Sequence, residues 1–216
     1  MTILEKTWAA ALEKMPLVAI LRGIQPEEAL DVANVLIDQG FTIIEVPLNS
    51  PKPFKTLKMM SRNLGDRAMI GAGTVLCEED VDTCVEAGCE LIIAPNLDPD
   101  VAAACARHKV IYCPGVATPT EAFAAIKSGA HAIKLFPAES ITPSIVRALR
   151  AVIPSSVTML PVGGISPDNL GDFYNAGATG FGIGSALYKS GKPIEEIESA
   201  AKAFVAALHL AQQTTP

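Results

Sequence analysis

Apolar and β-branched residues recur along the chain in eight short runs, separated by longer stretches of mixed polarity. The runs are LVAILRG (17–23), TIIEVPL (42–48), AMIGAGTV (68–75), LIIAPN (91–96), VIYCPG (110–115), AIKLFP (132–137), VTMLPVGG (157–164) and GFGIGS (180–185). Their first residues are 19 to 26 positions apart, which leaves room for one short helix between consecutive runs. The pattern therefore predicts eight repeats of a strand followed by a helix.

Glycine and proline mark the boundaries of the same repeat. Glycine precedes several of the runs, where a left-handed residue ends a helix at the lowest steric cost. These glycines are Gly40, Gly65, Gly88, Gly129 and Gly177. Three pairs place an N-cap oxygen before a proline and predict helix starts. They are Asp98-Pro99, Thr118-Pro119 and Ser166-Pro167.

The runs are continuously apolar, which is typical of parallel strands that helices cover on both faces. Eight such units predict a (β/α)8 TIM barrel as a single domain over residues 1–216. Residues 1–15 precede the first strand and predict an extra N-terminal helix that caps the bottom of the barrel. An open, doubly wound sheet is the competing architecture, because strand order cannot be read from these runs.

Charge and composition narrow the class of partner. The chain carries 17 Lys and Arg against 23 Asp and Glu, a net charge of −6, and no basic run. It therefore offers no electrostatic surface for nucleic acid or an anionic membrane. No apolar run has the length of a membrane span, and Glu5 and Lys6 interrupt what would be a signal peptide. We expect a cytoplasmic protein that acts on small molecules.

Cysteine and histidine do not form a metal-binding or disulfide pattern. The five cysteines include no C-x-x-C pair, and the three histidines lie far apart in the sequence. A zinc site or a disulfide framework is therefore not expected, and the cysteines are interpreted as small core residues. We expect no metal and no cofactor. His131 precedes a strand at the bottom face and is interpreted as structural.

Two charged residues interrupt buried strands. Glu45 lies within TIIEVPL and Lys134 within AIKLFP, the second and sixth runs. A charge there is costly unless it is paired, neutralised or open to a cavity. Alternate strands of a barrel contribute inward side chains to the same layer, so the two residues are expected to face each other across the mouth. Either one alone is also compatible with a buried ion pair or a position at the rim.

This pair suggests a Schiff-base reaction. Desolvation lowers the pKa of a buried lysine, so Lys134 is interpreted as a nucleophile toward a ketone. Glu45 is interpreted as the group that shuttles protons during formation and breakdown of the adduct. The scarcity of histidine argues against zinc-dependent enolisation.

Other polar groups follow the strands at the same end. Gly163, Gly164, Gly184 and Ser185 come after the last two runs, where barrels often bind phosphate through backbone N–H groups. Simple tight turns are the alternative for these glycines. Arg22 follows the first run and offers a planar donor for a carboxylate, and Thr74 follows the third with a hydroxyl. Each of these two is also compatible with an ordinary rim residue.

The ordered motifs together resemble the KHG/KDPG aldolase family from the first strand to the C-terminus. They are EVPLNSP, GAGTVL, IIAPN, CPGVATPTEA, IKLFPAE, PVGGI and GIGSALY. The resemblance implies a metal-free class I aldolase that cleaves a phosphorylated 2-keto-3-deoxy sugar acid to pyruvate and D-glyceraldehyde 3-phosphate, usually as a homotrimer. It makes Lys134 the Schiff-base lysine and Glu45 the general acid and base. Pro95 in IIAPN and Phe136 in IKLFPAE are expected to contact the substrate.

Three positions indicate a branch of this family. Members that act on the gluconate epimer typically read E-V-T-L-R-T and P-T-G-G-I, where this chain has Asn49 in EVPLNS and Val162 in PVGGI. It resembles instead the branch that cleaves 2-dehydro-3-deoxy-6-phosphogalactonate, in which A-I-L-R-G supplies the arginine, here Arg22. The alternatives are the gluconate epimer, an enzyme for both epimers, or, in a different class, a non-covalent sugar-phosphate isomerase or sensor.

Overall fold

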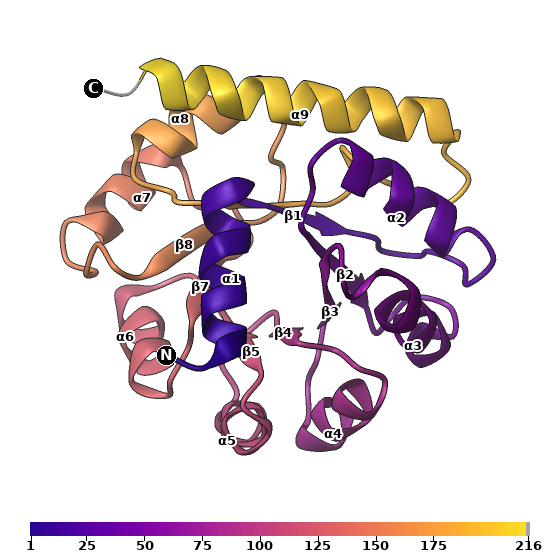
Figure 1. Cartoon of the computed structure of the whole chain (residues 1–216). Helices are drawn as coiled ribbons and strands as arrows, with labels where there is room; N and C mark the ends of the chain where they lie inside the picture. The colour runs from indigo at the N-terminus through magenta and orange to yellow at the C-terminus, as the bar shows by residue number, and fades with distance from the viewer. Residues whose placement is uncertain (215–216) are drawn as a thin grey trace.

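The predicted strands form a closed ring of parallel strands surrounded by helices in the computed structural model, which describes residues 1–214 (Figure 1). Residues 215 and 216 of the expected 1–216 domain lie outside the described residues. The strands are β1 (Leu17–Ile20), β2 (Ile43–Pro47), β3 (Met69–Gly73), β4 (Leu91–Ile93), β5 (Ile111–Cys113), β6 (Gly115–Val116), β7 (Ala132–Leu135), β8 (Thr158–Pro161) and β9 (Phe181–Ile183). Every strand pair is parallel, and the expected TIM-barrel fold is confirmed.

The fifth expected strand is divided into β5 and β6 at Pro114, which has no N–H to donate to a ladder. The sheet is described as two parts, in the orders β5-β4-β3-β2-β1-β9 and β6-β7-β8. Backbone hydrogen bonds join the two parts at both places where they meet. Between β5 and β7, Lys134 N donates to Pro114 O at 2.9 Å, and between β8 and β9, Thr179 N donates to Met159 O at 3.1 Å. A bridge between Val162 and Gly182 also joins the loop after β8 to β9. Because of the division, Lys134 lies on β7.

Helices alternate with the strands and form the outer layer (Figure 1). They are α1 (Ile3–Lys14), α2 (Ala29–Asp38), α3 (Pro53–Leu64), α4 (Glu78–Glu86), α5 (Pro99–His108), α6 (Pro119–Lys127), α7 (Pro143–Arg150), α8 (Leu170–Asn175) and α9 (Ile194–Thr214). The predicted caps of α5 and α6 are confirmed, since Asp98 accepts two N–H groups and Thr118 forms a capping box with Glu121. Among residues 1–214, no helix combines the length and apolar character of a membrane span.

One predicted helix start and one predicted glycine conformation are wrong. Ser166 does not cap α8; that helix begins at Leu170, after Asn169. The side chain of Asn169 instead closes the loop after β8, accepting from Ser166 N and donating to Gly164 O, each at 2.9 Å. Gly65 ends α3 with a right-handed φ of −57°, because its N–H continues the helical pattern to Ser61 O. The other four helix-ending glycines have positive φ, as expected.

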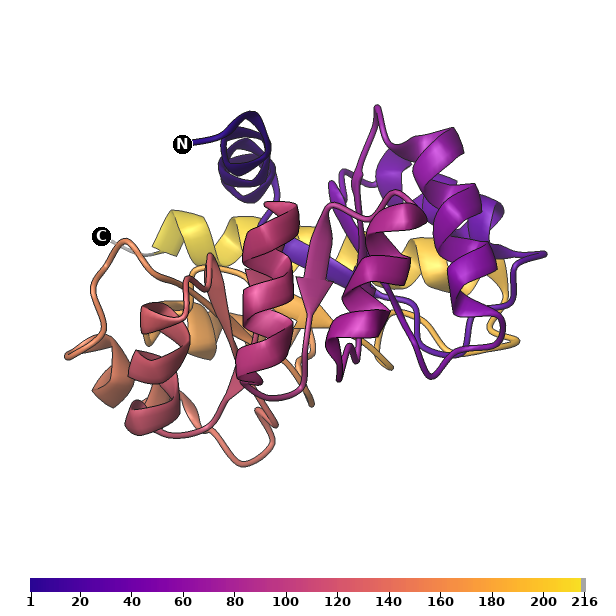
Figure 2. The ribbon, with the colours of Figure 1, turned by 90° about the horizontal axis from the view of Figure 1, so that it is seen from below.

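The N-terminal helix α1 lies across one end of the ring (Figures 1 and 2). Its Trp8 is 5% exposed and packs in a cluster with inward residues of the strands, including Val18, Ile43 and Leu160. His131 belongs to this same end: its Nδ1 accepts Tyr112 N–H at 3.1 Å, and its Nε2 lies 3.5 Å from Glu5. Apolar packing therefore fills the barrel near α1 and leaves the carboxyl ends of the strands for polar groups.

Candidate active site

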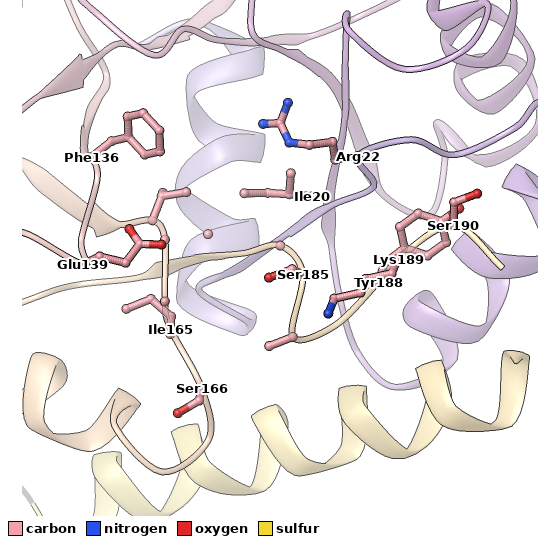
Figure 3. A pocket seen from close by; sticks show the side chains of 16 residues that line it. Ile20, Arg22, Phe136, Glu139, Ile165, Ser166, Ser185, Tyr188, Lys189 and Ser190 are labelled. Carbon is pink, nitrogen blue, oxygen red and sulfur yellow. The ribbon is translucent and has the colours of Figure 1, made fainter. Parts of the chain in front are cut away.

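A cavity of about 460 Å³ opens at the carboxyl ends of the strands (Figure 3). It is lined by residues from the end of β1, from the loop after β7, and from the loops after β8 and β9. Seven residues that the sequence indicates for substrate line it: Arg22, Phe136, Val162, Gly163, Gly164, Gly184 and Ser185. The tertiary structure thus brings together groups that are up to 163 positions apart, from 22 to 185.

Lys134 and Glu45 lie next to this cavity, deeper in the barrel, and are not among the residues that line it. Both line a much smaller closed space in the barrel, about 10 Å³, together with Cys113. The two spaces share Ile20, Val162 and Gly182 as lining residues, so they adjoin. Lys134 is 5% exposed and Glu45 is 1% exposed. The expectation that strands β2 and β7 present these two side chains to one interior layer agrees with this placement.

Burial lowers the pKa of Lys134, and the nearby Arg22 guanidinium lowers it further, while the charge of Glu45 raises it. Desolvation is the largest of these influences. The Lys134 Nζ atom also lies 4.5 Å from the centroid of the Phe136 ring, on the side of the larger cavity. A lowered pKa favours the neutral amine, which is the form that nucleophilic attack on a ketone requires.

Burial acts on Glu45 in the opposite direction and raises its pKa to about 7, although Lys134 and Arg22 both oppose this rise. Its Oε2 atom is buried and has no hydrogen-bond partner. A carboxyl group with a pKa near neutrality can both accept and return a proton at physiological pH. Burial favours the neutral form of each group, whereas the charge of each favours the charged form of the other.

Cys113 is the third polar side chain of this closed space. It is fully buried, and burial raises the pKa of its thiol to about 12. The thiol is therefore protonated and acts as the small core residue that the sequence indicates. All five cysteines are free, and no group of three or more His, Cys, Asp or Glu within residues 1–214 is arranged to hold a metal ion.

The loop after β2 holds the arginine at the cavity wall. Arg22 Nη1 donates to Asn49 Oδ1 at 2.6 Å, and Gly23 N donates to Ser50 Oγ at 3.0 Å. Arg22 therefore points its guanidinium into the cavity while one of its donors is engaged by a neighbouring loop (Figure 3). The remaining donors are suited to a planar carboxylate.

The turn after β8 has two consecutive glycines with positive φ, and a carboxylate lies against it. Gly163 and Gly164 have φ of 107° and 64°. A Cβ on Gly163 would overlap Glu139 Oε2, and one on Gly164 would lie 3.0 Å from Glu139 Cγ. The exposed Glu139 side chain thus occupies space beside the turn that the sequence indicates for phosphate.

Sequence reasoning missed several residues of the cavity. Glu139, Ser166, Lys189 and Ser190 all line it (Figure 3). Each is a single polar residue in a loop, where no periodic pattern separates a cavity-lining residue from a solvated one. Only Glu139 carried a sequence signal for a place in the site, because it is the last residue of the IKLFPAE motif that contains Lys134.

Two of the predicted substrate-contacting residues, Pro95 and Thr74, do not line the 460 Å³ cavity. Pro95 lines a neighbouring cavity of about 260 Å³, which shares Phe136 with the larger one. Thr74 follows β3 with a φ of 57°, an unusual conformation for a β-branched residue, and is not among the lining residues. Both lie after their strands, at the same end of the barrel as the site.

Comparison with known proteins gives consistent results. Residues 9–201 match the family model described as KDPG and KHG aldolase. The 2-dehydro-3-deoxy-6-phosphogalactonate aldolase of Escherichia coli is 44% identical over 93% of this chain and 98% of its own length.

Two solved structures are similar over most of the chain. A native KDPGal structure has a TM-score of 0.91 at 44% identity and covers 93% of this chain and 97% of its own. A KDPG aldolase from Legionella pneumophila, with pyruvate captured as a covalent carbinolamine intermediate, has a TM-score of 0.82 at 25% identity and covers 94% of this chain and 98% of its own.

Proposed function

The chain belongs to the KDPG and KHG aldolase family, and from that premise we propose that it is a class I aldolase for 2-dehydro-3-deoxy-6-phosphogalactonate. The products are pyruvate and D-glyceraldehyde 3-phosphate. The observation that carries this proposal is the buried Lys134 amine beside the buried Glu45 carboxyl, at the base of a cavity that carries Arg22 on its wall. A neutral amine and a proton carrier are the two groups that imine chemistry needs.

The reaction begins when the Lys134 amine attacks the C2 ketone of the substrate. Glu45 donates a proton to the carbinolamine hydroxyl, which leaves as water and gives a protonated imine. Glu45 then takes the proton of the C4 hydroxyl, the C3–C4 bond breaks, and its electron pair moves into the imine to form an enamine. The aldehyde leaves, and Glu45 gives the proton it took from the C4 hydroxyl to C3 of the enamine, which restores the protonated imine. Water then adds to C2, pyruvate is released with the neutral Lys134 amine, and the proton set free returns to Glu45.

The substrate's two anionic ends are assigned to opposite parts of the cavity. Arg22 binds the carboxylate, with Thr74 toward the carboxylate and keto end. The phosphate lies on Gly163, Gly164, Gly184 and Ser185, where backbone N–H groups and one hydroxyl are available. Phe136, Pro95 and Val162 form apolar walls. The exposed side chain of Glu139 lies against Gly163 and Gly164, beside this phosphate position.

The galactonate branch is supported by three features of this chain. Arg22 lines the cavity, Asn49 engages Arg22, and Val162 lies where the other branch has threonine. The identity of 44% to a 2-dehydro-3-deoxy-6-phosphogalactonate aldolase, against 31% to the 2-dehydro-3-deoxy-phosphogluconate aldolase of Zymomonas mobilis, supports the same branch. Comparison of kcat/KM for the two C4 epimers tests it. A preference for the galactonate form is expected, and equal rates or the reverse preference would refute the branch.

The covalent step is tested by trapping. Incubation with pyruvate and sodium borohydride, followed by peptide mass spectrometry, should place a reduced adduct on Lys134. The Lys134→Ala variant should give none, and Lys202→Ala, which removes an exposed lysine of α9, should react like the parent. Absence of an adduct, or its persistence in Lys134→Ala, would exclude the Schiff-base mechanism and favour a non-covalent isomerase or sensor.

We propose further that the protein is a cytoplasmic homotrimer. The family resemblance supports the trimer, and the even dispersal of acidic and basic residues along the chain supports an aqueous compartment. Light scattering of the purified protein measures the mass directly. A mass three times that of the 22.6 kDa chain is expected, and a monomer or dimer would contradict the assignment.

A further inference from the structure

The last residue of β3, Gly73, lies beside the side chain of Glu45. It pairs in register with Pro47 of β2, and its carbonyl oxygen accepts the N–H of Leu48 at 2.8 Å. Gly73 is not among the positive-φ glycines, so its backbone conformation is one that any residue can adopt. The need for glycine at this position must come from space rather than from the backbone.

The space is filled by the Glu45 carboxyl group. An ideal Cβ on Gly73 would lie 2.5 Å from Glu45 Oε1 and closer still to Oε2 and Cδ. Real Cβ atoms essentially never come within 3.0 Å of such neighbours. The carboxyl therefore rests on the bare backbone of β3 at Gly73, two residues beyond Gly71, the register partner of Glu45.

Gly71 serves a different purpose on the same strand. A Cβ there would meet the backbone oxygen and side chain of Leu91 on β4, so this glycine allows the strands to pack. The contact of Gly73 is with a functional side chain instead. Gly71 is therefore required by the packing of the strands, whereas Gly73 is required by the position of the Glu45 side chain.

The location on Gly73 determines what surrounds the carboxyl. The charged or titratable groups that face it are Lys134 on β7, Arg22 after β1 and Cys113 on β5. Its Oε2 has no hydrogen-bond partner. A methyl group at position 73 would push the carboxyl out of this dry slot, toward Lys134 or toward the water of the larger cavity.

We propose that Gly73 is a positioning residue, which by lacking a side chain creates the slot that holds the Glu45 carboxyl in the geometry for proton transfer to and from the substrate on Lys134. This inference rests on the proposed aldolase function. It assigns Gly73 a role in the proton-transfer steps and none in binding phosphate or forming the barrel.

A double-mutant cycle with Gly73→Ala and Glu45→Gln tests this role. Gly73→Ala alone should lower kcat roughly 100-fold, the lower range of general acid–base contributions. In the Glu45→Gln background the proton carrier is already lost, so the same substitution should change kcat by less than about 3-fold. Glutamine keeps the size of glutamate, so a purely structural effect would appear equally in both backgrounds. Equal losses, or a Gly73→Ala variant with the kcat and pH profile of the parent, would overturn the proposal.

The pH profile supplies a second readout. One limb of the plot of kcat/KM against pH should reflect the titration of Glu45 and should disappear in Glu45→Gln. In Gly73→Ala the same limb should shift to lower pH, because a carboxyl displaced toward water ionises more easily. Gly171→Ala is the matched control: Gly171 lies in α8, where a Cβ would meet only Ala211 Cβ at an ordinary 4.0 Å. It should leave kcat and the profile unchanged.

A folding defect does not remove the test. If Gly73→Ala is unfolded in thermal melts, Glu45→Asp combined with Gly73→Ala should restore a folded protein, because the shorter side chain makes room for the new methyl group. A double variant that stays unfolded overturns the proposal. Borohydride trapping of the pyruvate adduct on the parent enzyme, measured in the same series, separates failure of this proposal from failure of the proposed function. If the parent forms no adduct, the proposed function fails; if it forms one and Gly73→Ala behaves as the parent, only the role of Gly73 fails.

Discussion

Glu45 and Lys134 line one closed space inside the barrel, yet burial shifts their pKa values toward each other, raising that of the carboxyl to about 7 and lowering that of the amine. A buried ion pair would be expected to do the reverse, since each charge stabilises the other. The Oε2 atom of Glu45 instead lacks a hydrogen-bond partner. The pair is therefore arranged for exchanging a proton rather than for holding two fixed charges.

This arrangement makes folding stability depend on pH in a defined direction. The folded-state pKa of Glu45 is about 7, above the ordinary value of 4.5, so the folded protein binds more protons between these values than the unfolded chain. The contribution of Glu45 to stability is thus present below pH 4.5 and lost as the pH rises through 7. Glu45→Gln should raise the melting temperature more at pH 8 than at pH 5. Glu196→Gln, at an exposed position of α9, is the control and should show no such difference. A larger gain at pH 5 would contradict the direction.

Asn49 should influence substrate affinity through Arg22. The 2.6 Å bond from Arg22 Nη1 to Asn49 Oδ1 restricts the guanidinium, and Asn49→Ala would release it into solvent. Hydrogen bonds of an exposed charged group contribute about 1 kcal/mol, so KM should rise roughly 3- to 10-fold with little change in kcat. Asn63→Ala, which removes an exposed asparagine of α3 bonded to Met59 O, should leave both constants unchanged. A loss confined to kcat would be inconsistent with a role in binding.

Glu139 should weaken phosphate binding. Its carboxylate lies against Gly163 and Gly164, where a phosphate would meet both its volume and its charge. Glu139→Gln removes the repulsion, which at an exposed site is worth about 1 kcal/mol, and should lower KM for the phosphorylated substrate roughly 3- to 10-fold. The rate of adduct formation with pyruvate, which has no phosphate, should be unaffected. A higher KM in this variant would instead indicate that Glu139 binds the substrate.

Val162 should influence the choice between the C4 epimers. Its side chain lines both the large cavity and the closed space that contains Lys134 and Glu45. Threonine has nearly the same shape, so Val162→Thr adds a hydroxyl with little change in volume. The ratio of kcat/KM values should move toward the gluconate epimer by about 1 to 3 kcal/mol, or roughly 5- to 150-fold. Val157→Thr, a half-buried position just before β8, should leave the ratio unchanged; a shift there of equal size would contradict a local effect at Val162.

Much of the fold was accessible from the sequence because it rests on local signals. Apolar runs at a regular spacing located every strand, and the caps at Asp98 and Thr118 located two helix starts. The local rules failed at two points. The Asn169 side chain bonds Ser166 N and Gly164 O and closes the loop, so α8 begins only at Leu170. At Pro114, which has no N–H for the ladder, one apolar run becomes two strands.

By itself, the sequence determined that Glu45 and Lys134 are exceptional, because a charge within an apolar strand conflicts with burial wherever the strand packs. Only the tertiary structure decided how the two are used. The closure of β2 and β7 into one ring brings them to a common space, and the absence of a Cβ at Gly73 sets where the carboxyl rests. It also decided that Glu139 and Lys189 share the cavity with Arg22. Hydrophobic patterning is local and can be read along the chain, whereas the position of a functional group depends on strands and loops that are distant in the sequence.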